Sequence, residues 1–467
     1  MSGLGTTARS ARREDRHPRD PHEQQREPGS RATDQASRLL SAIVSVVADH
    51  GYAGAKIGEI ANRAGVSRAT FYELFDDKEA CFAEAHAVLA REVGAEVEAA
   101  IRQDDPADAG NAAISATARI ATRNPDTLTF LTHHALLAGP RPRDSHDRLM
   151  SDLENAVEEA WGQARPGSAV PDVPARMLLG GATRLLCLTL RRYGCCPAEV
   201  PAVLDRWVDS YRTADRSGSR RRLLQAAELG FRPENPAAAR ASSPRILPRG
   251  RHRLPRDVVD GIQRERIAYA TADVIRAHDG TAVAVAEIVA AAGVSREVFY
   301  AYFSDKEQAF LATHQLIFEQ LMAASSSAFF TPGTSWPERV WDGACAFAGL
   351  LAANPSFAHF AFVAAYGMGE TGVRRMDETA LAWGLFLEEG YRAGPETAEL
   401  SRLTSDAIAL GVMEAAARYV RSGRGDDLSA LVPTVVYAAL APFVGPDSAA
   451  ALVESKLAAS GMRCPVA

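Results

Sequence analysis

Two short stretches of the 467-residue chain place cationic, hydroxyl and aromatic side chains at the start of a predicted helix. In the first stretch, Arg68 can bond a guanine in bidentate fashion, and Thr70 can contact a thymine methyl group or a phosphate. Tyr72 can donate its hydroxyl to a phosphate while its ring packs against the protein. Lys78 adds positive charge to the free N–H groups at the start of the next helix. These residue types in this order predict contact with double-stranded DNA.

The same stretch indicates which elements must position these side chains. A short amphipathic helix is expected over 57–64. Gly65 follows at a tight turn that needs a positive φ, and Val66 fills the space between two helices. Ser67 is a candidate N-cap for a second helix over 68–74. This order is typical of a helix-turn-helix motif, whose second helix enters the major groove of DNA.

The motif occurs twice in the chain. Residues 57–86 read IGEIANRAGVSRATFYELFDDKEACFAEAH, and residues 285–314 read VAEIVAAAGVSREVFYAYFSDKEQAFLATH. At a constant offset of 228, 15 of these 30 positions are identical. The dipeptide Asn124-Pro125 also matches Asn354-Pro355, at an offset of 230. Because this period is far longer than that of a solenoid repeat, the sequence predicts a duplicated two-domain unit.

A family resemblance rests on the segments EIANRAGVSRATFYELFDDKEACF and EIVAAAGVSREVFYAYFSDKEQAF. Both resemble the DNA-binding domain of the tetracycline-repressor (TetR) family. The resemblance implies an all-α chain in which each three-helix DNA-binding domain precedes a helical, ligand-binding and dimer-forming domain. The DNA contacts that it implies are Lys56, Ser67, Arg68, Ala69, Thr70, Tyr72 and Lys78 in the first unit and Ser295, Arg296, Glu297, Tyr300, Tyr302 and Lys306 in the second.

The second copy departs from this pattern more than the first. Val298 lacks the hydroxyl of Thr70, and Glu297 faces phosphates unfavourably unless it accepts from a cytosine amine. Ala284, at the position of Lys56, can neither contact a phosphate nor cap a helix. We therefore expect the second module to be the weaker DNA binder. The alternative is a helical interaction protein in which one or both modules no longer read DNA.

The chain divides into two halves joined by a basic segment. That segment, 213–256, holds eleven arginines and three acidic residues, a formal charge of +8 in a chain of net charge −6. The expected divisions are a disordered tail (1–33), a first DNA-binding domain (34–95) and regulatory domain (96–212), the linker (213–256), and a second DNA-binding domain (257–323) and regulatory domain (324–460). The linker is long enough to join two halves placed one DNA turn apart.

Four stretches resemble the last helices of the family, which usually form a four-helix bundle between protomers. They are Ala175–Tyr193, Pro197–Tyr211, Ala398–Val420 and Leu428–Val444. We therefore favour an intramolecular pseudo-dimer, with an asymmetric operator. An ordinary homodimer that carries four modules is the alternative.

The second regulatory domain is rich in aromatic residues that could line a cavity for a small apolar effector. They are Phe347, Phe357, Phe360, Phe362, Tyr366, Trp383 and Phe386. Aromatic residues at helical spacing are more often ordinary core, so both interpretations stay open. His133 and His134 alone predict no metal site, because adjacent residues point in different directions on a helix. No cofactor is expected.

The remaining composition excludes several classes. The six cysteines form no C-x-x-C pair, so neither a zinc ribbon nor a disulfide framework is indicated. No P-loop, G-x-S-x-G or H-E-x-x-H motif suggests an enzyme. No apolar run approaches the ~20 residues of a membrane span, and the N-terminus lacks the apolar centre of a secretion signal. The sequence thus predicts a cytoplasmic transcriptional regulator, with repression as the expected outcome.

Overall fold

The computed structural model describes residues 28–213, 254–278 and 283–460, with isolated positions between 221 and 231. Over these residues the chain is α-helical and forms no β-strand, apart from one isolated bridge between Pro171 and Arg212. The predicted all-α class is confirmed. Most of the predicted tail and linker lies outside the described residues, although the first helix begins at Pro28, before the expected end of the tail.

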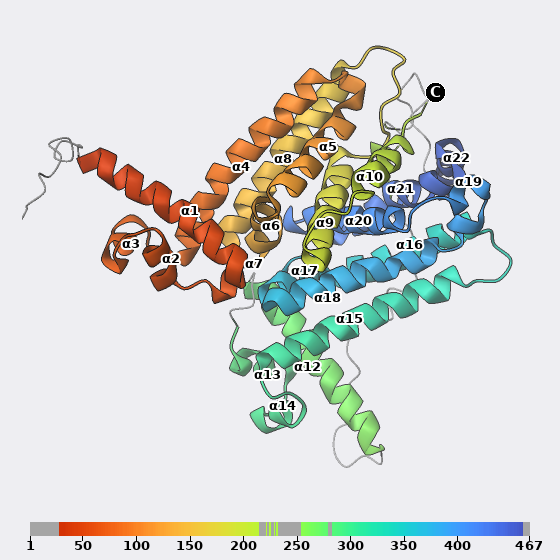
Figure 1. Cartoon of the computed structure of the whole chain (residues 1–467). Helices are drawn as coiled ribbons and strands as arrows, with labels where there is room; N and C mark the ends of the chain where they lie inside the picture. The colour runs from red at the N-terminus through yellow and green to blue at the C-terminus, as the bar shows by residue number, and fades with distance from the viewer. Residues whose placement is uncertain are drawn as a thin grey trace, which may run out of the picture.

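Each half starts with the same small helical domain. In the first half its helices are α1 (Pro28–Gly54), α2 (Ile57–Arg63), α3 (Arg68–Leu74) and the start of α4 (Lys78–Gln103). In the second half they are α12 (Arg256–His278), α13 (Val285–Ala292), α14 (Arg296–Tyr302) and the start of α15 (Lys306–Phe329). Figure 1 shows the first domain at the left of the molecule and the second at the bottom.

Equivalent side chains make equivalent contacts in the two small domains. Arg38 of α1 donates to the Ala64 carbonyl at 3.0 Å, and Arg266 of α12 donates to the Ala292 carbonyl at 2.7 Å. Each arginine closes the C-terminal end of the helix that precedes the turn, where carbonyl groups lack helical partners. The duplication that the sequence predicts therefore extends to individual hydrogen bonds.

The regulatory part of each half is a set of longer helices. In the first half they are α5 (Ala109–Arg123), α6 (Pro125–Thr129), the π-helix η3 (Phe130–His134), α7 (Ala135–Leu137), α8 (Pro140–Gln163), α9 (Ala175–Tyr193) and α10 (Val200–Asp209). In the second half they are α16 (Trp336–Ala353), α17 (Pro355–Phe362), α18 (Gly369–Ala382), α19 (Pro395–Ala398), α20 (Leu403–Arg421), α21 (Val432–Val444) and α22 (Pro446–Ala459). Short 3₁₀ turns η2 (Pro106–Asp108), η5 (Ala364–Met368), η6 (Trp383–Leu387), η7 (Gly390–Arg392) and η8 (Gly425–Leu431) connect them.

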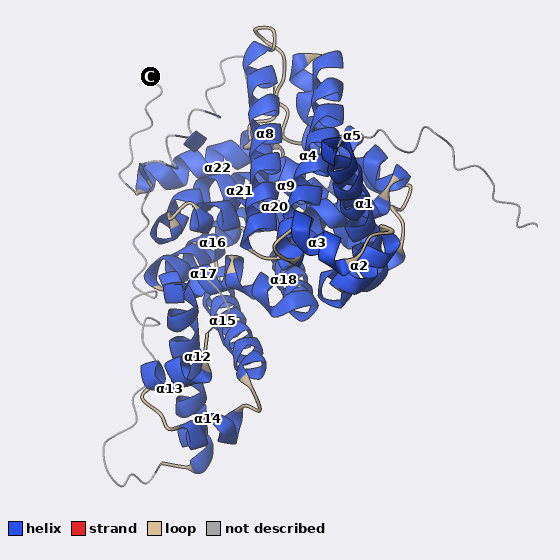
Figure 2. Cartoon of the chain, turned by 90° about the vertical axis from the view of Figure 1, so that its left-hand side faces the viewer, coloured by secondary structure: helices blue, strands red, loops and turns tan. Residues whose placement is uncertain are grey.

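The two halves meet where α9 and α20 pack against each other at the centre of the molecule (Figures 1 and 2). These helices are equivalent at the repeat offset of 228. A Cβ on Gly181 would lie 2.6 Å from the Ala407 carbonyl oxygen, and one on Gly411 would lie 2.6 Å from the Met177 carbonyl oxygen. Glycine is therefore needed at both positions, because only a missing Cβ lets the two backbones approach so closely.

The expectation that no apolar stretch approaches the length of a membrane span is wrong for one segment. The segment Gly425–Val444, formed by η8 and α21, is long and apolar enough to cross a membrane by length and composition alone. However, 78% of its most apolar stretch is buried inside the protein. A helix that is apolar on every side is typical of a core helix surrounded by others, and α21 packs against α16, α20 and α22. We interpret the segment as core.

Candidate nucleic-acid interface and ligand cavity

The first helix-turn-helix motif has the geometry that its sequence predicts. Gly65 has a φ of 65°, in the left-handed region that favours glycine. The Ser67 hydroxyl accepts the Thr70 N–H at 3.0 Å and caps α3. Phe71 is fully buried beneath the helix, which leaves the opposite face to solvent. This exposed face carries Arg68, Ala69 and Tyr72, with Thr70 half-buried beside them.

Tyr72 stands out from this face. It is 57% exposed, and its ring meets the ring of buried Phe71 edge to face at 5.5 Å. Arg68 and Tyr72 share a shallow concavity with Lys56 and Lys78, which also borders Gly58. A Cβ at Gly58 would clash with the Arg68 guanidinium. Gly58 therefore makes room for the arginine, a role that the motif alone did not indicate.

Lys78 lies at the first turn of α4 and faces the same concavity. Its amine donates to the carbonyls of Tyr52 at 2.7 Å and Ala55 at 3.1 Å, and it lies 4.1 Å from the centre of the Tyr52 ring. Partial burial lowers the pKa of the amine. Lys78 thus also holds the end of α1, which sequence reasoning did not predict. Asp77 caps α4 as expected, accepting the Ala80 N–H at 2.7 Å.

The second motif repeats this geometry. Gly293 has a φ of 61°, and Ser295 caps α14 by accepting the Val298 N–H at 3.2 Å. Tyr300 is 55% exposed, and its ring meets the buried Phe299 ring edge to face at 5.3 Å. Both motifs therefore expose one tyrosine on the outer face of an N-capped helix. In this type of motif, that helix enters the major groove of DNA.

Comparison with known proteins identifies these two modules. The family model described as bacterial regulatory proteins of the tetR family matches residues 39–85 and 267–313. The chain carries two tandem TetR units. No curated protein sequence matches the chain.

Three solved structures similar to this chain each cover less than half of it. A transcriptional regulator from Rhodococcus sp. Rha1 is 22% identical over 38% of this chain and 95% of its own, with a TM-score of 0.33. A TetR family regulator from Marinobacter aquaeolei VT8 is 22% identical over 39% and 98%, with a TM-score of 0.32. FadR from Bacillus subtilis, solved in complex with stearoyl-CoA, is 14% identical over 38% and 98%, with a TM-score of 0.32.

The second TetR unit differs from the expected contacts at one aromatic residue. Tyr302 is half-buried, and its hydroxyl donates to Asp260 of α12 at 2.7 Å. The Tyr302 hydroxyl, which the sequence predicts to contact DNA, therefore already donates to a carboxylate within the protein. Arg296 and Glu297 are exposed and Lys306 is half-buried. Ala284 cannot cap α13 with its side chain, but this lack is partly offset because the Glu287 carboxylate accepts the Ala284 N–H at 2.7 Å.

Sequence reasoning missed one pair that holds each TetR module together. His50 of α1 lies 2.9 Å from the Glu59 carboxylate of α2, and His278 lies 3.0 Å from that of Glu287. The signal was present, because these histidines and glutamates are identical at the repeat offset of 228. Identity between the copies therefore marks structural contacts as well as the residues that are expected to contact DNA.

A second candidate site is an apolar cavity of about 140 Å³ in the second regulatory domain. Of the seven aromatic residues predicted to line a pocket, Phe347, Trp383 and Phe386 do so. Phe360 borders a small neighbouring cavity and Tyr366 a separate polar one. The other two, Phe357 and Phe362, are buried and border none of these three cavities, so their role in an effector pocket stays a prediction.

Two polar atoms interrupt the apolar lining of this cavity. The Ser325 hydroxyl is buried, and neither it nor the Trp383 ring N–H has a hydrogen-bond partner among the described residues. Buried polar groups are normally paired, because leaving one unpaired costs free energy. A ligand that presents an acceptor on an otherwise apolar body would satisfy them.

Proposed function

We propose that the chain is a cytoplasmic, sequence-specific DNA-binding transcriptional regulator that represses its targets until a small apolar effector releases it. The observation that carries this proposal is the N-capped helix α3 of a TetR module, which exposes Arg68, Ala69 and Tyr72 on one face. An arginine in the first turn of such a helix suits a guanine edge, and a tyrosine further along the same exposed face suits a phosphate.

We further propose that the two halves act as a single-chain pseudo-dimer. Support comes from α9 and α20, which are equivalent helices of the two halves and pack at a close crossing. Across this junction, Arg176 of α9 is buried and lies 2.8 Å from the Glu414 carboxylate of α20. Two further arginines of α9, Arg184 and Arg191, lie 3.3 and 2.7 Å from Asp377 of α18.

The charges at this junction favour unlike halves as partners. At the repeat offset, Arg176 corresponds to Thr404, and Glu414 corresponds to Leu186. Pairing two first halves through this face would therefore leave Arg184 and Arg191 without Asp377. It would leave Arg176 with only the more distant carboxylates of its own half, those of Asp147 at 3.5 Å and Glu154 at 4.0 Å. An unpaired buried charge is strongly destabilising, and such a penalty acts against wrong partners. The charge pattern at the junction therefore favours the pseudo-dimer over a homodimer of like halves.

The test is selection of bound fragments from random duplex DNA by the purified full chain at about 100 mM salt. We expect one enriched, asymmetric motif with two half-sites, because α3 and α14 present different residues to the groove. A palindromic motif would contradict the pseudo-dimer. No enrichment would contradict DNA recognition itself and favour the interaction-protein alternative.

The effector proposal predicts that filling the apolar cavity blocks ligand entry. Ala344 lines the cavity, so Ala344→Phe should reduce binding of the apolar dye anilinonaphthalene sulfonate by roughly tenfold. Ala398→Phe, at an exposed position of α19, is the matched control. The measurement is dye fluorescence against protein concentration. Equal dye binding by both variants would count against this cavity as the effector site.

A further inference from the structure

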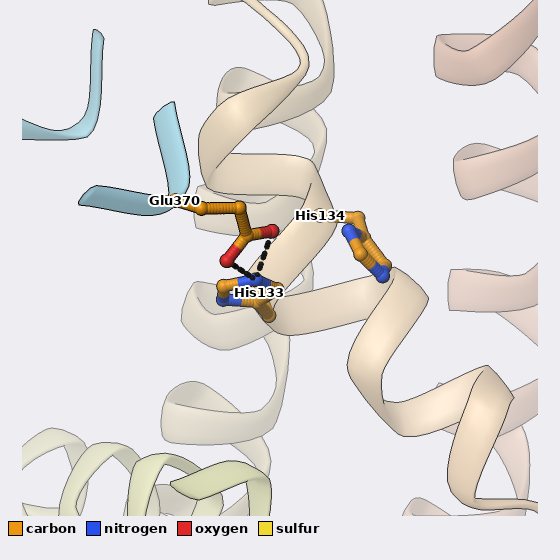
Figure 3. A group of neighbouring side chains, drawn as sticks. All are labelled: His133, His134 and Glu370. Atoms are coloured by element: carbon orange, nitrogen blue, oxygen red, sulfur yellow. Dashed lines mark hydrogen bonds and ion pairs between the residues drawn. The ribbon is translucent and has the colours of Figure 1, made fainter. Parts of the chain in front are cut away.

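Three potential metal ligands from both halves of the chain converge beside α9. His133 and His134 belong to the π-helix η3, and Glu370 lies in the first turn of α18. One donor atom of each lies within 4.8 Å of the other two. The His133 Nε2 atom is 2.8 and 2.9 Å from the two Glu370 carboxylate oxygens. Figure 3 shows this carboxylate reaching toward the two imidazoles from the other half.

The π-helix explains how adjacent histidines serve one site. In the α-helix that the sequence suggested, neighbouring side chains diverge; a π-helix has wider turns and is often found at functional sites. Here the ring centres of His133 and His134 lie 4.9 Å apart, with their planes at 65°. The third group, Glu370, is 237 residues from His133 in sequence. Neither the helix type nor this partner was visible in the sequence.

The burial and the hydrogen bonds of the three groups suit a cation. His134 is largely buried, and its Nδ1 atom has no hydrogen-bond partner in the part of the chain that the structure describes. This ring nitrogen is therefore available to a ligand, because a buried polar atom is normally paired. The Glu370 carboxylate, which accepts from His133, supplies the negative charge of the site. The Glu370 side chain is 56% exposed, which gives an ion a path from solvent.

We propose that His133, His134 and Glu370 bind one divalent cation of the zinc class at the junction of the two halves. Two neutral imidazoles and one carboxylate, with a fourth position open to water, are an established donor set for Zn²⁺. Metal–ligand bonds of 2.0–2.2 Å at tetrahedral angles put donor atoms ~3.3 Å apart. His133 and Glu370 must therefore separate slightly, and His134 must move inward.

One neighbouring charge opposes the cation. Arg191 lies 3.9 Å from the Glu370 carboxylate and competes for it. Arg191 has a closer partner in Asp377, at 2.7 Å. Arg191 can therefore keep its ion pair with Asp377 when a metal ion binds Glu370. Metal binding then costs the protein only the weak contact between Arg191 and Glu370, and the metal gains three ligands.

The same π-helix contacts the first DNA-binding domain. Phe130 stacks on Phe82 of α4 at 4.1 Å. The Leu131 carbonyl lies 3.0 Å from the His86 ring of α4 and 2.9 Å from the His146 ring of α8. A metal that draws His134 inward would therefore displace groups packed on α4. This effect on DNA rests on the proposed function, whereas metal binding does not.

The test is titration of the metal-free full chain with Zn²⁺, by calorimetry, and with Co²⁺, by visible absorption. We expect one equivalent of Zn²⁺ and the visible absorption of tetrahedral Co²⁺. His134→Ala and Glu370→Gln should each weaken binding by about a hundredfold or more, since even changes around a ligand cost 10- to 100-fold. His50→Ala is the matched control, because His50 also pairs with a carboxylate, that of Glu59, at 2.9 Å; it should bind normally.

A structural role alone predicts a different result. Glu370→Gln can still accept from His133, so the metal-free variant should melt near the wild type; Zn²⁺ should stabilise only the wild type and the control. Wild-type protein without the Co²⁺ absorption, or variants that bind as tightly as wild type, would overturn the site. DNA affinity with and without Zn²⁺ is measured separately, so loss of DNA binding is not confused with loss of the metal.

Discussion

Glu414→Gln should lower the free energy of unfolding by about 3 kcal/mol, the low end of the range for breaking a buried ion pair. The Glu414 side chain is only 7% exposed and lies 2.8 Å from Arg176 and 3.2 Å from Arg421. Removing its charge leaves Arg176, itself 3% exposed, with the more distant carboxylates of Asp147 at 3.5 Å and Glu154 at 4.0 Å. Because these two carboxylates still partly compensate the charge of Arg176, we expect a loss of free energy of unfolding at the low end of that range.

Urea unfolding followed by circular dichroism measures this loss. The matched control is Glu389→Gln, which breaks a half-exposed pair with Arg339 and should cost below about 1 kcal/mol. Replacing both partners, Arg176 by Met and Glu414 by Leu, should recover much of the stability, because no buried charge is then left unpaired. A loss in Glu414→Gln no larger than in the control would show that the buried pair does not stabilise the junction.

The pair also has a pH signature. Burial alone would raise the pKa of Glu414, but Arg421 and Arg176 outweigh burial and lower the pKa to about 2. The ion pair therefore stabilises the fold fully above the ordinary value of 4.5, and this contribution is lost as the pH falls toward 2. The loss between pH 4.5 and 2 should be smaller in Glu414→Gln than in the wild type.

Arg68→Ala should weaken binding to the selected operator by about 10- to 100-fold, the effect of losing one bidentate base contact. Arg68 is exposed, so the substitution removes the proposed DNA contact without opening the core. Specificity should relax at one position of a single half-site. The measurement is DNA affinity at fixed salt, on the selected operator and on versions changed at each position.

Two further arginine substitutions serve as comparisons for Arg68→Ala. Arg102→Ala, on the exposed end of α4, removes the same charge away from the motif and should bind nearly as wild type. Arg296→Ala in the second module should lose less than Arg68→Ala, because Glu297 and Val298 weaken its surroundings. Equal losses at Arg68 and Arg102 would mean that Arg68 acts only through general charge. Equal losses at Arg68 and Arg296 would make the modules equal partners.

The local parts of the fold were predictable from the sequence. The helix α3, its Ser67 cap and the positive φ of Gly65 follow from residues within a few positions of each other. Long-range partners were not predictable in this way. Lys78 binds carbonyls 23 and 26 residues away, and Tyr302 binds Asp260, 42 residues away. These contacts depend on how helices pack, which local spacing does not encode.

The junction between the halves illustrates the same limit. The repeat predicts that α9 and α20 are equivalent, but not that Arg176 pairs with Glu414, because neither residue is repeated in the other half. The cavity was located only in part, since aromatic residues at helical spacing serve core and pocket alike. Which of them borders empty space depends on neighbouring small residues such as Gly343 and Ala344.

The packing of α9 against α20 within one polypeptide has a consequence for gene dosage. Separate subunits dissociate on dilution, so the population of a two-chain dimer falls with the square of monomer concentration when monomers predominate. Two helices tethered in one chain meet at a high effective concentration that does not depend on how many molecules a cell contains. Occupancy of a target by this chain would therefore rise in simple proportion to copy number, and even a few molecules would be fully assembled.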